Sequence, residues 1–68
     1  MSIKEKYYDY VLHRLKDSEV TNEEEIVFSI LSDMTDRRNL RQAWESIDED
    51  IQCEIIDEWI KIVKRKTL

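Results

Sequence analysis

Residues 48–64, which read DEDIQCEIIDEWIKIVK, repeat apolar side chains at the spacing of an α-helix. The apolar residues cover about half of the helical wheel and charged residues fill the rest. Asp48 is a good N-cap, and acidic residues in the first turn with lysines in the last turn suit the helix dipole. We therefore predict an amphipathic helix here. Its apolar residues are Ile51, Ile55, Ile56, Trp59, Ile60, Ile62 and Val63.

Three shorter segments upstream show the same periodicity, at about residues 3–17, 23–33 and 37–46. Ser2 with Glu5, and Thr21 with Glu24, have the three-residue spacing of a capping box, in which the side chain and backbone at a helix start bond reciprocally. These pairs place the starts of the first and second predicted helices.

The order of the segments predicts an all-α fold: a compact antiparallel bundle of three to four short helices, built by residues 1–68 as a single domain. Thr35 or Asp36 is the expected cap of the third helix. Residues 26–31 also fit a buried strand, but the caps around them and the lack of hairpin turn residues favour a helix. One longer helix from residue 34 onward, bent at 47–48, is an alternative for the second half.

Composition excludes several classes of site. The 68 residues contain no glycine and no proline and carry a net charge of −5. Phosphate-binding loops, dinucleotide fingerprints and EF-hands all require glycine at fixed positions. Cys53 is the only cysteine, so an internal disulfide is impossible. A lone thiol suits a reducing compartment, and no apolar run approaches the ~20 residues of a membrane span. We therefore expect a cytoplasmic protein with no membrane association.

The apolar arcs are wide for so short a chain. The first, second and fourth predicted helices each carry an arc of about 200°, whereas a surface helix usually needs little more than 100°. A chain of this length has little material with which to cover the surplus. The sequence therefore favours burial against another chain, either a second copy in a homodimer or a protein partner. The alternative is a monomer with a dense core and tyrosine hydroxyls at its rim.

The expected contact surface combines the surplus apolar residues with a charged rim, because aromatic side chains and arginines are enriched where proteins meet. Its apolar members are Tyr7, Tyr10, Val11, Trp59 and Val63. Its rim is formed by Arg37, Arg38 and Arg41.

Catalytic chemistry is not predicted. His13 has Asp9 and Asp17 four residues to either side, which would align three metal ligands on a continuous helix. A single helix supplies no further ligands, so the pattern favours a solvated polar face over a metal site. Cys53 reads as a buried, inert thiol. Four short helices leave little room for a cavity of about 300 Å³ or more. We expect no enzyme activity, no metal, no cofactor and no small-molecule substrate.

Charge patterning bears on nucleic-acid binding. Residues 17–36 and 42–58 each carry seven acidic residues and no Lys or Arg, so direct binding to nucleic acid is not expected. The predicted function is that of a small acidic interaction or regulatory module that acts by binding. One alternative is an inhibitor of phage or mobile-element type, whose acidic helices imitate a nucleic acid. Another is a helix-turn-helix regulator that reads DNA through the three arginines.

Overall fold

The computed structural model describes residues 2–66, and every regular element within them is helical. The elements are α1 (Ile3–Val11), a 3-10 turn η1 (Asp17–Glu19), α2 (Asn22–Thr35), α3 (Arg38–Glu45) and α4 (Glu49–Lys66). The predicted all-α fold is confirmed, and α3 and α4 are separate helices rather than one bent helix. Among the described residues, no helix has the length and apolar character that crossing a membrane requires.

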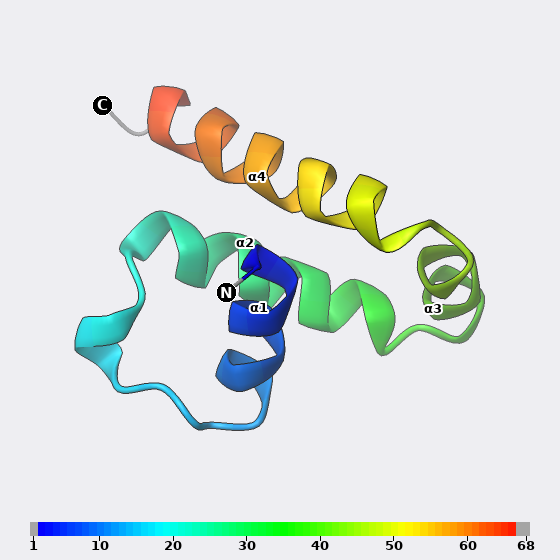
Figure 1. Cartoon of the computed structure of the whole chain (residues 1–68), viewed down its shortest axis with the longest axis horizontal. Coiled ribbons are helices and arrows are strands. Elements are labelled where there is room, and N and C mark those ends of the chain that lie inside the picture. The colour runs from blue at the N-terminus through cyan, green and yellow to red at the C-terminus, as the bar shows by residue number, and fades with distance from the viewer. Residues whose placement is uncertain (1, 67–68) are drawn as a thin grey trace.

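The two longest helices form the frame of the molecule. Figure 1 shows α2 and α4 running in opposite directions, so that the start of α2 and the end of α4 lie at the same end. The N-terminal helix α1 packs against both, and α3 turns the chain from α2 into α4.

The predicted capping box forms completely at the start of α2 and in part at the start of α1. Thr21 and Glu24 form the predicted capping box: Glu24 N–H donates to Thr21 Oγ1 at 3.1 Å, and Thr21 N–H donates to Glu24 Oε1 at 2.9 Å. At α1, the structure records only the forward bond, from Glu5 N–H to Ser2 Oγ at 3.2 Å. These bonds satisfy backbone donors that the first helical turn leaves free.

The predicted cap of the third helix was wrong. Thr35 is the last residue of α2, and its hydroxyl donates to Leu31 O at 2.9 Å. Asp36 closes α2 instead of opening α3, and Arg37 precedes α3 with no side-chain cap. Thr35 continues the helical backbone of α2 and stands two residues before the N-cap position of α3, which is Arg37, so its hydroxyl bonds backward within α2.

The first helix ends six residues earlier than predicted, at Val11 instead of residue 17. His13 adopts a left-handed conformation with φ 58°. Its N–H donates to Tyr10 O at 3.1 Å, and Arg14 N–H donates to Asp9 O at 2.8 Å. This is the bonding of a Schellman motif, which usually places glycine where His13 stands. The early end also removes the helical face on which His13 was expected to lie between two aspartates.

The core is aromatic and aliphatic and lies where α1, α2 and α4 meet, and α3 adds Trp44 to it. Tyr7 packs its ring 5.7 Å from that of Phe28, and its hydroxyl lies 3.4 Å from Thr35 Oγ1. Tyr7 is only 5% exposed, which corrects the expectation that it contributes to an outer contact surface. The buried apolar residues are Tyr7, Val27, Phe28, Leu31, Trp44 and Ile56.

Candidate interaction face

An apolar hollow lies on the surface between α2 and α4. It has a volume of about 260 Å³. Its lining residues are Val27, Ile30, Trp59, Ile62 and Val63, and we call them together the α2–α4 face. Each of them is apolar, whereas most solvent-facing hollows of a small protein mix polar and apolar groups. A lining of this kind is suited to exclude water against a partner.

Helical spacing explains how the face forms. Val27 and Ile30 are three residues apart on α2, and Trp59, Ile62 and Val63 have i, i+3, i+4 spacing on α4. Residues at these spacings share one side of a helix. Val27 is buried and forms the floor. Ile30, 60% exposed, and Ile62, 38% exposed, form the rims. Two antiparallel helices thus present their apolar stripes to solvent side by side.

Trp59 is held in place from beneath. Its ring stacks on that of Trp44 from α3, with ring centroids 6.2 Å apart and an interplanar angle of 23°. Trp44 is itself buried in the core. The tryptophan of the face is therefore a rigid element of the surface, and a rigid aromatic side chain loses little conformational freedom when a partner covers it.

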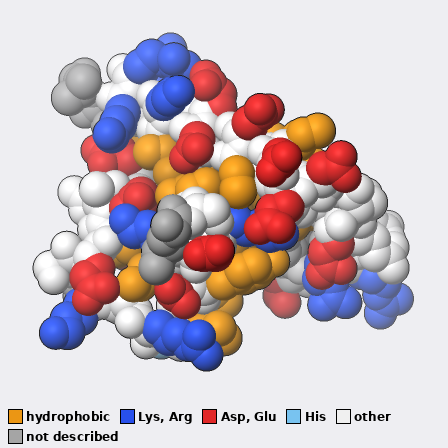
Figure 2. Space-filling model, viewed as in Figure 1, with side chains coloured by type: hydrophobic (Ala, Val, Ile, Leu, Met, Phe, Trp, Pro, Cys, Tyr) orange, Lys and Arg blue, Asp and Glu red, His pale blue; other side chains and the backbone are white. Residues whose placement is uncertain are grey.

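Opposite charges flank the face at one end. Glu23 lies one turn before Val27 on α2, and Lys66 lies one turn after Ile62 on α4. Figure 2 shows Lys and Arg side chains gathered where α4 ends. Because α2 starts where α4 ends (Figure 1), the acidic first turn of one helix and the basic last turn of the other border the same end of the face.

The structure separates the residues that the sequence grouped into one contact surface. Trp59 and Val63 line the α2–α4 face, but the residues from α1 lie elsewhere. Tyr10 packs its ring 5.4 Å from Phe28, and its hydroxyl lies 3.1 Å from Ser29 Oγ. Val11 is exposed at the end of α1. Two members of the expected surface therefore belong to this face, and it also contains Ile30 and Ile62, which sequence reasoning missed.

The three arginines do not act as one group. Arg37 Nη2 lies 3.3 Å from Asp33 Oδ2 in an exposed ion pair one helical turn apart. Arg38 is exposed at the start of α3, and Arg41 lines a separate groove between α1 and α3. The expected charged rim of Arg37, Arg38 and Arg41 thus lies beside α3 rather than around the α2–α4 face.

The structure also bears on the sites that were weighed for chemistry. No group of three or more His, Cys, Asp or Glu side chains in the described part of the chain is arranged to hold a metal ion. Cys53 is partly buried beside Ser2, Ile3 and Lys6. The expectation of little room for a cavity was wrong: the groove that Arg41 lines has a volume of about 310 Å³.

An ion pair ties α1 to the start of α2. Lys6 Nζ lies 2.9 and 3.0 Å from the two carboxylate oxygens of Glu24, whose side chain is 12% exposed. Burial by itself raises the pKa of Glu24. The hydrogen bond from the Thr21 backbone and the bond and charge of Lys6 together outweigh it, so the pKa lies below its usual value of 4.5. The folded state thus favours the ionised carboxylate.

This shift predicts a loss of stability in acid. Because the pKa of Glu24 is lower in the folded than in the unfolded chain, its stabilisation is present above the unfolded pKa and disappears as pH falls through the folded pKa. Glu24→Gln should lower the free energy of unfolding at pH 7 by about 1–2 kcal/mol and flatten its dependence on pH below pH ~4.5. Urea unfolding followed by circular dichroism at a series of pH values measures both effects. Glu25→Gln, a neighbouring exposed carboxyl, is the control; an equal loss in that variant would contradict the assignment to Glu24.

Comparisons of this chain with protein-family models, with curated proteins and with solved structures found no match, so the geometry described above carries the functional argument.

Proposed function

We propose that this protein is a small interaction module that acts by binding, and that a second copy of the chain covers the α2–α4 face. The observation that carries the proposal is the wholly apolar lining of the hollow, with Ile30 and Ile62 exposed at its rims. A stable interface at the lower end of the usual range removes about 500 Å² of each copy from water. That area is about a tenth of the 5252 Å² of accessible surface of one chain.

The directions of the helices suit a second copy of the chain. A two-fold axis parallel to α2 and α4 sets α2 of one protomer against α4 of its partner. Because the two helices run antiparallel, each facing pair is antiparallel as well, and the four helices form a bundle around the joined faces. In this arrangement Glu23 of one protomer approaches the end of α4 that carries Lys66 in the other. Opposite charges therefore meet at the rim and set the register.

The dimer predicts a specific set of variants. Ile30→Glu puts a carboxylate into the apolar contact and should weaken self-association at least about 100-fold, or about 2.7 kcal/mol. Leu12→Glu is the matched control, because Leu12 is 57% exposed at the end of α1, outside the α2–α4 face, and should associate like wild type. Sedimentation equilibrium over a range of protein concentrations measures the mass, and circular dichroism verifies that each variant is folded.

Charge reversal tests the orientation. Glu23→Lys should weaken the dimer, and adding Lys66→Glu to the same chain should restore much of the association. Glu25→Lys is the control: Glu25 lies on the opposite side of α2, and its reversal should have little effect at physiological salt. A wild-type mass of one chain at the highest concentration would overturn the proposal. So would equal loss of association in Ile30→Glu and Leu12→Glu.

A further inference from the structure

A groove on another part of the molecule shares no residue with the α2–α4 face. It lies between α1, α3 and the start of α4 and has a volume of about 310 Å³, which is within the range of small-molecule sites. Aromatic and aliphatic side chains form its walls, among them Tyr7, Tyr8, Trp44 and Ile47. Flat rings from two helices thus border one space, which suits a planar and largely apolar molecule.

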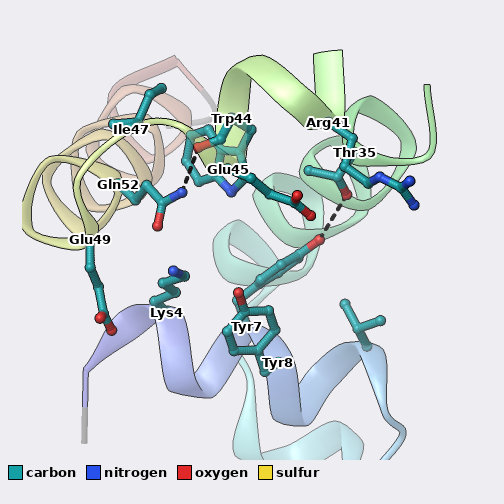
Figure 3. A pocket seen from close by; sticks show the side chains of 11 residues that line it. Lys4, Tyr7, Tyr8, Thr35, Arg41, Trp44, Glu45, Ile47, Glu49 and Gln52 are labelled. Carbon is teal, nitrogen blue, oxygen red and sulfur yellow. Dashed lines mark hydrogen bonds between the residues drawn. The ribbon is translucent and has the colours of Figure 1, made fainter. Parts of the chain in front are cut away.

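A buried, unsatisfied acceptor belongs to this groove. Gln52 lines it and is 2% exposed. Its Nε2 donates to Trp44 O at 2.6 Å, and because a carbonyl only accepts, this bond fixes which end of the amide carries the nitrogen. The other end, Oε1, has no hydrogen-bond partner in the described residues. Figure 3 shows this oxygen turned away from Trp44 and toward α1.

An unpaired buried acceptor is destabilising, so its retention needs a reason. In the unfolded chain water donates to this oxygen, and folding removes that hydrogen bond without replacing it. A ligand with an N–H group directed at Oε1 removes this cost, and an otherwise identical molecule without the N–H does not. The acceptor therefore selects ligands by a single donor, in the way that buried polar groups discriminate among ligands of the same shape.

Charges at the mouth of the groove balance. Lys4 and Arg41 are basic, and Glu45 and Glu49 are acidic. Lys4 Nζ already lies 5.5 Å from the centre of the Tyr8 ring. Two charges of each sign give no strong preference for an anion or a cation, so the ligand is expected to be neutral.

We infer that this groove binds a small, neutral, planar heterocycle whose ring N–H donates to Gln52 Oε1 while its faces lie against the tyrosine and tryptophan rings. The inference is independent of the proposed dimer. Trp44 of the groove stacks on Trp59 of the α2–α4 face, so the two tests use variants that leave this pair intact: Ile30→Glu for the dimer and Gln52→Met for the groove.

Two molecules of nearly identical shape test the inference. Indole carries the ring N–H, and indene has a CH₂ group in its place. In a titration followed by amide chemical shifts in NMR, indole should bind about tenfold more tightly than indene, with shifts centred on Tyr8, Trp44 and Gln52. If indole causes no shifts at millimolar concentration, or if the two molecules bind equally, the inference is wrong.

Variants assign the preference to the amide oxygen. Gln52→Met keeps the length of the side chain, removes the acceptor, and should bind indole and indene equally. Trp44 O keeps a partner in that variant because it also accepts from Ile47 N–H at 3.1 Å. Ile26→Ala, outside both the groove and the α2–α4 face, should retain the tenfold preference. If Gln52→Met does not fold, the comparison of the two molecules on the wild-type protein still decides. Preserved preference in folded Gln52→Met would overturn the role of Oε1.

Discussion

Replacing Phe28 with alanine is expected to lower the free energy of unfolding by about 3–5 kcal/mol. Phe28 is fully buried, and its ring is packed by those of Tyr7 and Tyr10 at 5.7 and 5.4 Å. Truncation removes the ring contacts that Phe28 makes with α1 and leaves a cavity in the core. For 68 residues the total stability is about 3–10 kcal/mol, so this one change removes a large fraction of it.

Urea unfolding of wild type and variant, followed by circular dichroism, measures the loss. Ile26→Ala is the matched control on the same helix, because Ile26 is exposed and does not line the hollow. It should cost less than about 1 kcal/mol. Equal losses in Phe28→Ala and Ile26→Ala would contradict the assignment of Phe28 to the centre of the core.

A local signal in the sequence was sufficient for the capping box of Thr21 and Glu24, whose two partners lie within one helical turn. The end of α1 could not be predicted in the same way. Apolar periodicity continues past Val11, and the left-handed residue that ends the helix is His13 rather than the glycine that usually signals a Schellman motif. Such an ending depends on backbone bonds that leave no mark in the composition.

The candidate site was predictable only in part, for a related reason. Wide apolar arcs indicate that some apolar surface stays uncovered, and Ile30 and Ile62 are indeed exposed. A helical wheel does not show which side of an apolar arc packs against a neighbouring helix and which side stays exposed. Tyr7 and Trp59 looked equivalent in the sequence, but α1 turns Tyr7 into the core, whereas α4 leaves Trp59 at the edge of the hollow. Predicting which of the two residues is buried requires knowledge of how α1, α2 and α4 pack together.

Trp59 contributes to both the fold and the proposed dimer face. Trp59→Ala is expected to lower the free energy of unfolding by about 3 kcal/mol. This value is at the lower end of the range for a large aromatic residue because the ring is partly exposed. The loss combines apolar contacts with the stacking on Trp44, which contributes about 0.5–1.5 kcal/mol. Trp59→Phe keeps an aromatic ring and should recover about half of it. A loss below about 1 kcal/mol in Trp59→Ala would mean that the ring contributes little to the stability of the fold.

Protein concentration separates the two roles of Trp59. Self-association stabilises the folded chain by mass action, so the wild-type unfolding midpoint should rise with concentration. The midpoint of Trp59→Ala should not, because the variant lacks the centre of the face. The difference in stability between the two proteins should therefore widen from micromolar to millimolar concentration. Phe28 does not line the α2–α4 face, so the unfolding midpoint of Phe28→Ala should still rise with protein concentration. A constant difference for Trp59→Ala would assign this residue to the fold alone.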